Sequence, residues 1–138
     1  MVVGAGLVPR AVARLGERRA LLLGLCFGAV GFALFGLAPT GAIFWLGVPV
    51  QALWGLSWPP MQGLMSARVS ASEQGQLQGS LGSLRGIGFM IGPGLFTLTF
   101  AYFISAQRDW HLPGAPFLLA ALLLTGAMLV GGRVTRPR

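Results

Sequence analysis

Four long apolar stretches make up most of this chain and contain a single charged residue, Arg85. They cover residues 20–38, 42–65, 81–104 and 115–131. A bilayer core of about 30 Å takes about 20 residues of helix to cross, so each stretch is long enough to span it. Helix is the expected form, because a lone strand leaves its backbone without partners in lipid and no period-two alternation predicts a barrel. The sequence therefore predicts an all-α membrane protein with four transmembrane helices.

The positive charges gather on one side of these stretches. The turn at 39–41 and the loop at 106–114 form the other side, and Arg108 is the one arginine or lysine in these two segments. The positive-inside rule then predicts that both termini are cytoplasmic, which an even number of spans also requires. The net charge of +7 is explained by orientation, and we predict no nucleic-acid partner. The arginines of the predicted cytoplasmic side are Arg10, Arg14, Arg18, Arg19, Arg68, Arg133, Arg136 and Arg138.

A polar and aromatic stripe runs along the second stretch. Its members, Gln51, Trp54, Trp58 and Gln62, recur at intervals of three, four and four, which places them on one face of a helix. Side-chain amides are costly in hydrocarbon unless they are paired, so this face is expected to avoid lipid. Two interpretations stay open: the face packs against a neighbouring helix, or it lines a cavity that contacts a substrate.

Proline predicts irregular backbone in two of the stretches. Pro59 and Pro60 remove two helix donors in the middle of the second stretch, where we expect the helix to kink or open. Gly92 and Pro93 predict another bend in the third stretch, either a hinge that moves during gating or a static kink. Small residues four apart in the third stretch predict close helix packing; they are Gly82 with Gly86 and Gly88 with Gly92.

Arg85 lies about one turn into the third stretch from the predicted cytoplasmic side. Its long side chain can extend its charge to the interface at less than the roughly 3 kcal/mol cost of a charge in the middle of the bilayer. A role in gating or in substrate contact is the alternative.

Residues that support catalysis are scarce in this sequence. The three acids, Glu17, Glu73 and Asp109, are expected in loops, and His111 stands beside Trp110 in a segment typical of an interfacial aromatic belt. No nucleophile–base pair, metal-ligand spacing or phosphate loop is present. We therefore predict no enzyme, no cofactor and no metal site.

The loop between the second and third stretches contains SARVS at 66–70 and EQGQLQGS at 73–80. This run closely resembles the tetracycline/proton antiporter branch of the major facilitator superfamily. The likeness extends to GFMIGP at 88–93 and to Pro60 and Leu64 before the loop.

A second motif lies upstream of the first stretch. Gly16, Arg18 and Arg19, with the glutamate between them, resemble the basic cytoplasmic motif found between helices two and three of each half of that superfamily. The match is partial, because Ala13 stands where the motif has aspartate and Pro9 where it has glycine.

The resemblance implies a single transmembrane region over residues 1–138, the C-terminal part of a twelve-helix fold. In that fold the tenth helix lines the central cavity and the eleventh helps to gate it. The resemblance thus implies drug contacts at Gln51, Trp54, Trp58 and Gln62, and gating roles for Arg85, Gly92 and Pro93. The implied segments are the end of helix 8 at 1–9, helix 9 at 20–38, helix 10 at 42–66, helix 11 at 80–105, helix 12 at 115–132 and a cytoplasmic tail at 133–138.

One departure from the family concerns proton coupling. Gly28 stands where tetracycline exporters have a membrane-embedded acid in the ninth helix. Three explanations stay open: a missing N-terminal half supplies the carboxylate, the substrate is not a metal-chelated tetracycline, or this piece does not transport.

The function implied is efflux of a tetracycline-like or other drug by proton antiport, in the inner membrane, as part of a full-length protein. The partners expected are the lipid bilayer, a small amphipathic drug, the proton, and the missing half or a complementary chain. Two alternatives remain, a small four-helix multidrug exporter and a short membrane protein that does not transport or depends on a partner. The exporter needs an intramembrane carboxylate, and none is visible.

Overall fold

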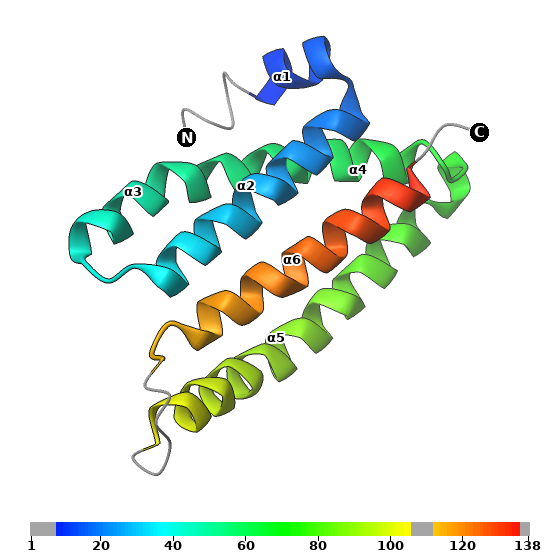
Figure 1. The fold of residues 1–138 in the computed structure, drawn as a ribbon. Helices are drawn as coiled ribbons and strands as arrows, with labels where there is room; N and C mark the ends of the chain where they lie inside the picture. The colour runs from blue at the N-terminus through cyan, green and yellow to red at the C-terminus, as the bar shows by residue number, and fades with distance from the viewer. Residues whose placement is uncertain (1–7, 106–111, 136–138) are drawn as a thin grey trace.

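The fold is described by a computed structural model of residues 8–105 and 112–135. Every regular element among these residues is helical (Figure 1). The expected segment 1–9 and the loop with Arg108, Asp109, Trp110 and His111 lie wholly or mostly outside the described residues. The elements are α1 (Val8–Leu15), α2 (Glu17–Leu37), α3 (Gly41–Ala52), the 3₁₀ helix η2 (Leu53–Ser57), α4 (Trp58–Ser66), the 3₁₀ helix η3 (Ala71–Glu73), α5 (Gln74–Ile104) and α6 (Ala115–Val134).

Helix α2 is the centre of the arrangement. It packs against α6 and against α3, η2 and α4, while α5 contacts α6 (Figure 1). Buried residues of α2 are mostly small, and their spacing of three or four keeps them on the contact faces. They are Ala20, Leu21, Gly24, Gly28, Gly31 and Gly36.

Three helices are long and apolar enough to cross a membrane: Glu17–Leu37, the η3–α5 unit Ala71–Ile104, and Ala115–Val134. The second of the four expected spans, 42–66, is not one α-helix. It is divided into α3, η2 and α4, so no single helix of that region has the required length. The apolar region is present, but its backbone is broken near the middle.

The break in this region follows from its prolines. Pro59 and Pro60 occupy the first turn of α4, where the missing N–H groups have no intrahelical partner to lose. In a continuous helix their rings would clash with the carbonyls of residues 55 and 56. The residues before them adopt 3₁₀ geometry instead, so the irregular backbone precedes the proline pair.

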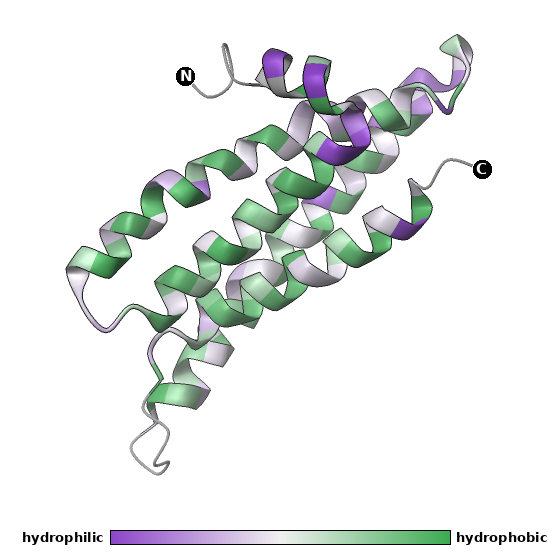
Figure 2. Ribbon diagram, turned by 45° about the horizontal axis from the view of Figure 1, so that its top comes forward, coloured by the Kyte–Doolittle hydropathy of each residue, from purple (hydrophilic) through white to green (hydrophobic). Residues whose placement is uncertain are grey.

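The hydrophilic residues collect at one end of the helices (Figure 2). The start of α2, the α4–α5 connection and the end of α6 meet there, while the α2–α3 turn lies at the other end (Figure 1). Glu17, which we expected in a loop, is the first residue of α2. An initial acid favours a helix N-terminus because it complements the helix dipole.

The glycines of α5 differ from expectation. An added Cβ at Gly82, Gly86, Gly88, Gly92 or Gly94 would meet no atom within 4 Å, so the predicted close packing of α5 is not found among the described residues. Close approach occurs on α2 instead. Neighbouring residues cover the glycines of α2, while the glycines of α5 meet open space.

Candidate functional site

The stripe of Gln51, Trp54, Trp58 and Gln62 is divided between two neighbouring helices. Because η2 interrupts the α-helical turn between them, the first two residues contact α2 and the last two contact α5. A single continuous face, as the spacing predicted, is therefore absent. The two halves of the stripe have different surroundings and are described separately.

The first half packs into the glycine face of α2. A Cβ added at Gly28 would lie 2.8 Å from Cδ1 of Trp54, and one added at Gly31 would collide with the amide oxygen of Gln51. The Trp54 ring also meets Phe32 edge-on, with centroids 5.7 Å apart. These contacts match the helix-packing interpretation for this half of the stripe.

Gln51 has an unusual position in this contact. Its Oε1 atom is buried and has no hydrogen-bond partner among the described residues. A buried acceptor without a donor is destabilising, because it has lost water without replacement. Gln51 therefore stays a candidate for binding a donor from outside the described residues.

The second half faces α5 through a cation–π contact. The guanidinium carbon of Arg85 lies 4.1 Å from the centroid of the Trp58 ring. Trp58 remains 46% exposed. The gating candidate and a drug-contact candidate are thus brought together, and the Arg85 side chain lies over an aromatic ring.

Amide hydrogen bonds continue the same α4–α5 contact toward the hydrophilic end. Nε2 of Gln78 donates to Oε1 of Gln62 over 3.4 Å, and Nε2 of Gln74 donates to the carbonyl of Ser66 over 3.0 Å. The two glutamines are four residues apart and so share one face of α5. The QGQLQGS run therefore joins the start of α5 to α4.

Gly92 and Pro93 are separate from this contact. Helix α5 continues through Pro93, and a Cβ at Gly92 would meet open space. Within the described residues, no contact links this pair to the stripe. Their expected gating role stays a prediction.

Arg18 of the basic motif and Arg68 of the α4–α5 connection donate hydrogen bonds to the end of α6. Arg18 donates from Nε to the hydroxyl of Thr135 over 3.3 Å and from Nη2 to the carbonyl of Gly132 over 3.1 Å. Arg68 donates to the carbonyl of Val134 over 3.1 Å. The last carbonyls of a helix lack intrahelical donors and form the negative end of its dipole, so two arginines stabilise this terminus.

The other motif residues have distinct positions. Gly16 has φ of 78° and joins α1 to α2, a backbone conformation that glycine adopts without steric cost. Arg19 is exposed and lines a groove beside α6. The Glu17 carboxylate lies against α4, since a Cβ at Gly63 would be 2.6 Å from its Oε1.

Several contact residues were not singled out from the sequence. Gly24 and Ser57 form part of the α2–η2 contact, and Gly31 lies against Gln51 of α3. Gln78 and Thr135 bind predicted site residues. The spacing of Gly24, Gly28 and Gly31 is a small-residue pattern that was available to find the first contact. Gln78 lies within the recognised QGQLQGS run, but no local pattern distinguishes Thr135.

Together these features define a helical membrane protein with a polar face between α4 and α5. Sequence comparison gives its relatives. The chain is 37% identical over 100 residues to the class G tetracycline resistance protein of Vibrio anguillarum, covering 70% of this chain and 25% of that protein. It is 33% identical over 129 residues to the class E tetracycline resistance protein of Escherichia coli, covering 89% and 30%.

A mammalian relative is also found. The human hippocampus abundant transcript 1 protein is 27% identical over 137 residues, covering 84% of this chain and 28% of that protein. No protein-family model and no solved structure matches the chain. The chain spans about a quarter to a third of the length of the curated relatives it matches.

The chain is a relative of the tetracycline resistance proteins, with classes B, C, E and G matching at 32–37% identity. These matches confirm the resemblance to the tetracycline/proton antiporter branch of the major facilitator superfamily. They place the chain with membrane transporters and apart from enzymes.

Proposed function

We propose that this chain forms part of a drug-efflux transporter of the major facilitator type, which exports a tetracycline-like or other amphipathic drug in exchange for protons. The similarity to four classes of tetracycline resistance protein supports the drug as substrate. Because the matched relatives are about three times as long as this chain, we propose that the rest of a transporter or a complementary chain completes the site.

The contact between Arg85 and Trp58 is the observation on which the proposed drug site depends. A half-exposed indole ring offers an aromatic surface, the nearby Gln62 amide offers hydrogen bonds, and the guanidinium supplies a charge. An amphipathic aromatic drug uses all three kinds of contact. Opening of α4 from α5 exposes this face more fully, which is the gating role proposed for Arg85, with Gly92 and Pro93 as the bend farther along α5.

Proton coupling is proposed to use a carboxylate outside this chain. Gly28 stands at the family's acidic position. Trp54 and Leu124 fill the space beside it, and Cδ1 of Leu124 would be 3.0 Å from an added Cβ. An aspartate there would displace one of these side chains. Of the described acids, Glu17 begins α2 and Glu73 ends η3, away from the middle of the apolar stretches.

We propose that the hydrophilic end of the helices is cytoplasmic and that the protein resides in the inner membrane. The arginines at the start of α2, before α5 and at the end of α6 support this orientation (Figure 2). Both termini then lie on the cytoplasmic side.

Drug export by matched tryptophan variants tests the proposal. Trp58→Ala and Trp45→Ala are introduced into the full-length protein, and tetracycline uptake into inverted membrane vesicles is measured at equal expression. Trp45 is 74% exposed on α3 and has no ring partner among the described residues. Uptake is expected to fall much more for Trp58→Ala; equal losses, or no proton-driven uptake by the unmodified protein, would contradict the proposal.

A further inference from the structure

A set of grooves follows the seam between α2 and α6, on a different contact from the proposed drug site. Two of them lie near the hydrophilic end and share the walls Leu22 and Met128. The first groove, of about 370 Å³, also contains Arg19; the second, of about 450 Å³, also contains Arg18 and Arg133. Each groove therefore has an apolar floor and an arginine at its edge.

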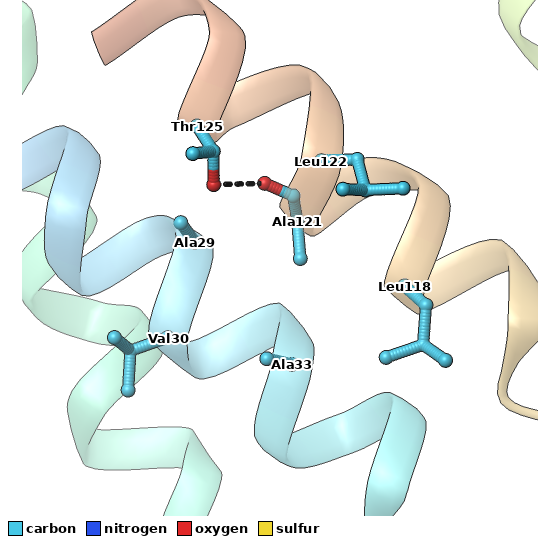
Figure 3. Close-up of a pocket in the computed structure, with 7 residues that line it drawn as sticks. All are labelled: Ala29, Val30, Ala33, Leu118, Ala121, Leu122 and Thr125. Atoms are coloured by element: carbon cyan, nitrogen blue, oxygen red, sulfur yellow. Dashed lines mark hydrogen bonds between the residues drawn. The ribbon is translucent and has the colours of Figure 1, made fainter. Parts of the chain in front are cut away.

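A third groove continues the seam toward the other end (Figure 3). It has a volume of about 440 Å³ and is formed by α2 residues facing α6 residues. On α2, Arg19, Leu22, Cys26, Ala29 and Ala33 follow one another at intervals of three or four, so the grooves line one helical face. From Arg19 to Ala33 this face extends about 21 Å along the helix, compared with about 15 Å for one leaflet of the bilayer core.

The lining of the third groove is apolar apart from one hydroxyl. That hydroxyl belongs to Thr125 and donates to the carbonyl of Ala121 over 2.8 Å, as the dashed line in Figure 3 marks. The Thr125 hydroxyl therefore already has a hydrogen-bond partner within α6. The surface of the groove is therefore hydrocarbon, and its lining favours an apolar ligand.

The arginines at the other end differ in their availability. Arg18 already donates hydrogen bonds to the carbonyl of Gly132 and to the hydroxyl of Thr135. Arg19 and Arg133 have no hydrogen bond or ion pair with any described residue. Two free guanidinium groups therefore border grooves whose remaining length is apolar.

We propose that this seam binds an anionic phospholipid, with its phosphate at Arg19 and Arg133 and an acyl chain along the groove between α2 and α6. The charge complements a phosphate, and the apolar length matches a chain within one leaflet. A small soluble anion would leave the apolar grooves unused, and an apolar helix would leave the two arginines without a partner. The proposal is independent of the drug and of proton coupling.

Lipid selectivity tests this site. The chain, expressed from its own gene, is purified and placed in nanodiscs of phosphatidylcholine that contain a minor fraction of phosphatidylglycerol. Native mass spectrometry then measures the ratio of the two retained lipids. The double variant Arg19→Gln/Arg133→Gln is compared with Arg10→Gln/Arg14→Gln, which removes the same charge from α1.

The unmodified chain is expected to prefer phosphatidylglycerol. Two basic side chains near an anionic headgroup account for about tenfold or more of that preference, so the Arg19/Arg133 variant loses it while the α1 variant keeps it. Ala29→Phe, which fills the apolar groove without a change of charge, should lower retention of phosphatidylglycerol as well.

Three results would overturn the proposal. Absence of preference in the unmodified chain excludes a headgroup site. Equal losses in the two arginine variants mean diffuse surface charge. A change of oligomeric mass in Ala29→Phe, with lipid retention unchanged, means that a helix of another copy occupies the groove.

Discussion

The guanidinium carbon of Arg85, in α5, lies 4.1 Å from the centre of the Trp58 ring, in α4. The two residues are 27 positions apart and belong to different apolar stretches. Their contact joins the face proposed to bind drug to the helix proposed to gate it. An arginine in an apolar helix would otherwise depend on the interface for solvation.

Double-mutant analysis should detect this contact. Trp58→Ala and Arg85→Gln each remove one partner, and a cation–π pair of this kind contributes about 0.5–1 kcal/mol when exposed. The loss in the double variant should be smaller than the sum of the single losses by about that amount, measured as thermal unfolding in detergent. Additive losses would mean that the two side chains do not interact.

The glycine face of α2 predicts a difference between two helices. Gly28→Leu should destabilise the protein by about 1–3 kcal/mol, because overpacking displaces the Trp54 ring. Gly86→Leu on α5 is the matched control, since an added side chain meets open space there. Detergent unfolding curves compare the two variants. A large loss for Gly86→Leu would show that another helix covers α5 in the assembled protein.

The end of α6 should loosen when its arginine donors are removed. Arg18→Gln/Arg68→Gln removes three hydrogen bonds to the last turn of α6. Amide hydrogen exchange in that turn should speed up by about tenfold, since a bond from a charged donor contributes about 1.5 kcal/mol and partial exposure reduces it. Arg14→Gln, in α1, is the control and should leave the exchange unchanged. Unchanged exchange in the double variant would contradict these contacts.

Cysteine cross-linking tests the joining of α4 to α5. In a Cys26→Ser background, Gln62→Cys and Gln78→Cys should be joined by a bis-maleimide with a short spacer, because the ends of the two long native side chains are within hydrogen-bond distance while a direct disulfide needs closer Cβ atoms. The pair Gln51→Cys and Gln78→Cys should not, since Gln51 packs against α2. Gel mobility after proteolysis between the sites reports the bond. Efficient cross-linking of the control pair alone would reverse the assignment.

Helix type and the position of the apolar regions were predictable from the sequence, because length and hydropathy alone define a helix that can span lipid. Pro59 and Pro60 correctly indicated irregular backbone, but not that five preceding residues would form η2. The 3₁₀ segment η2 divides the stripe. Helical periodicity cannot reveal this division, because it takes a constant period of about 3.6 residues along the whole stretch.

The partners of Arg18 and Arg85 were beyond the sequence for a related reason. Arg18 contacts Thr135 across 117 positions, and contacts of such range depend on tertiary packing. The glycines of α5 were more conspicuous than those of α2, yet only the latter are covered by side chains among the described residues. Small-residue spacing shows where a close approach is permitted, while the neighbouring helices decide where it occurs.

Thiol accessibility of the stripe tests the central claim, that the Trp58–Gln62 half faces the transport path while the Gln51–Trp54 half is packed against α2. Single cysteines at these four positions, in a Cys26→Ser background of the full-length protein in native membranes, are treated with a water-soluble maleimide. Cysteines at 58 and 62 should react, and added tetracycline should protect them; the cysteine at 51, where the native amide oxygen is buried against α2, should react slowly. Reaction at 51 with protection at 58 and 62 in the absence of drug would contradict the account.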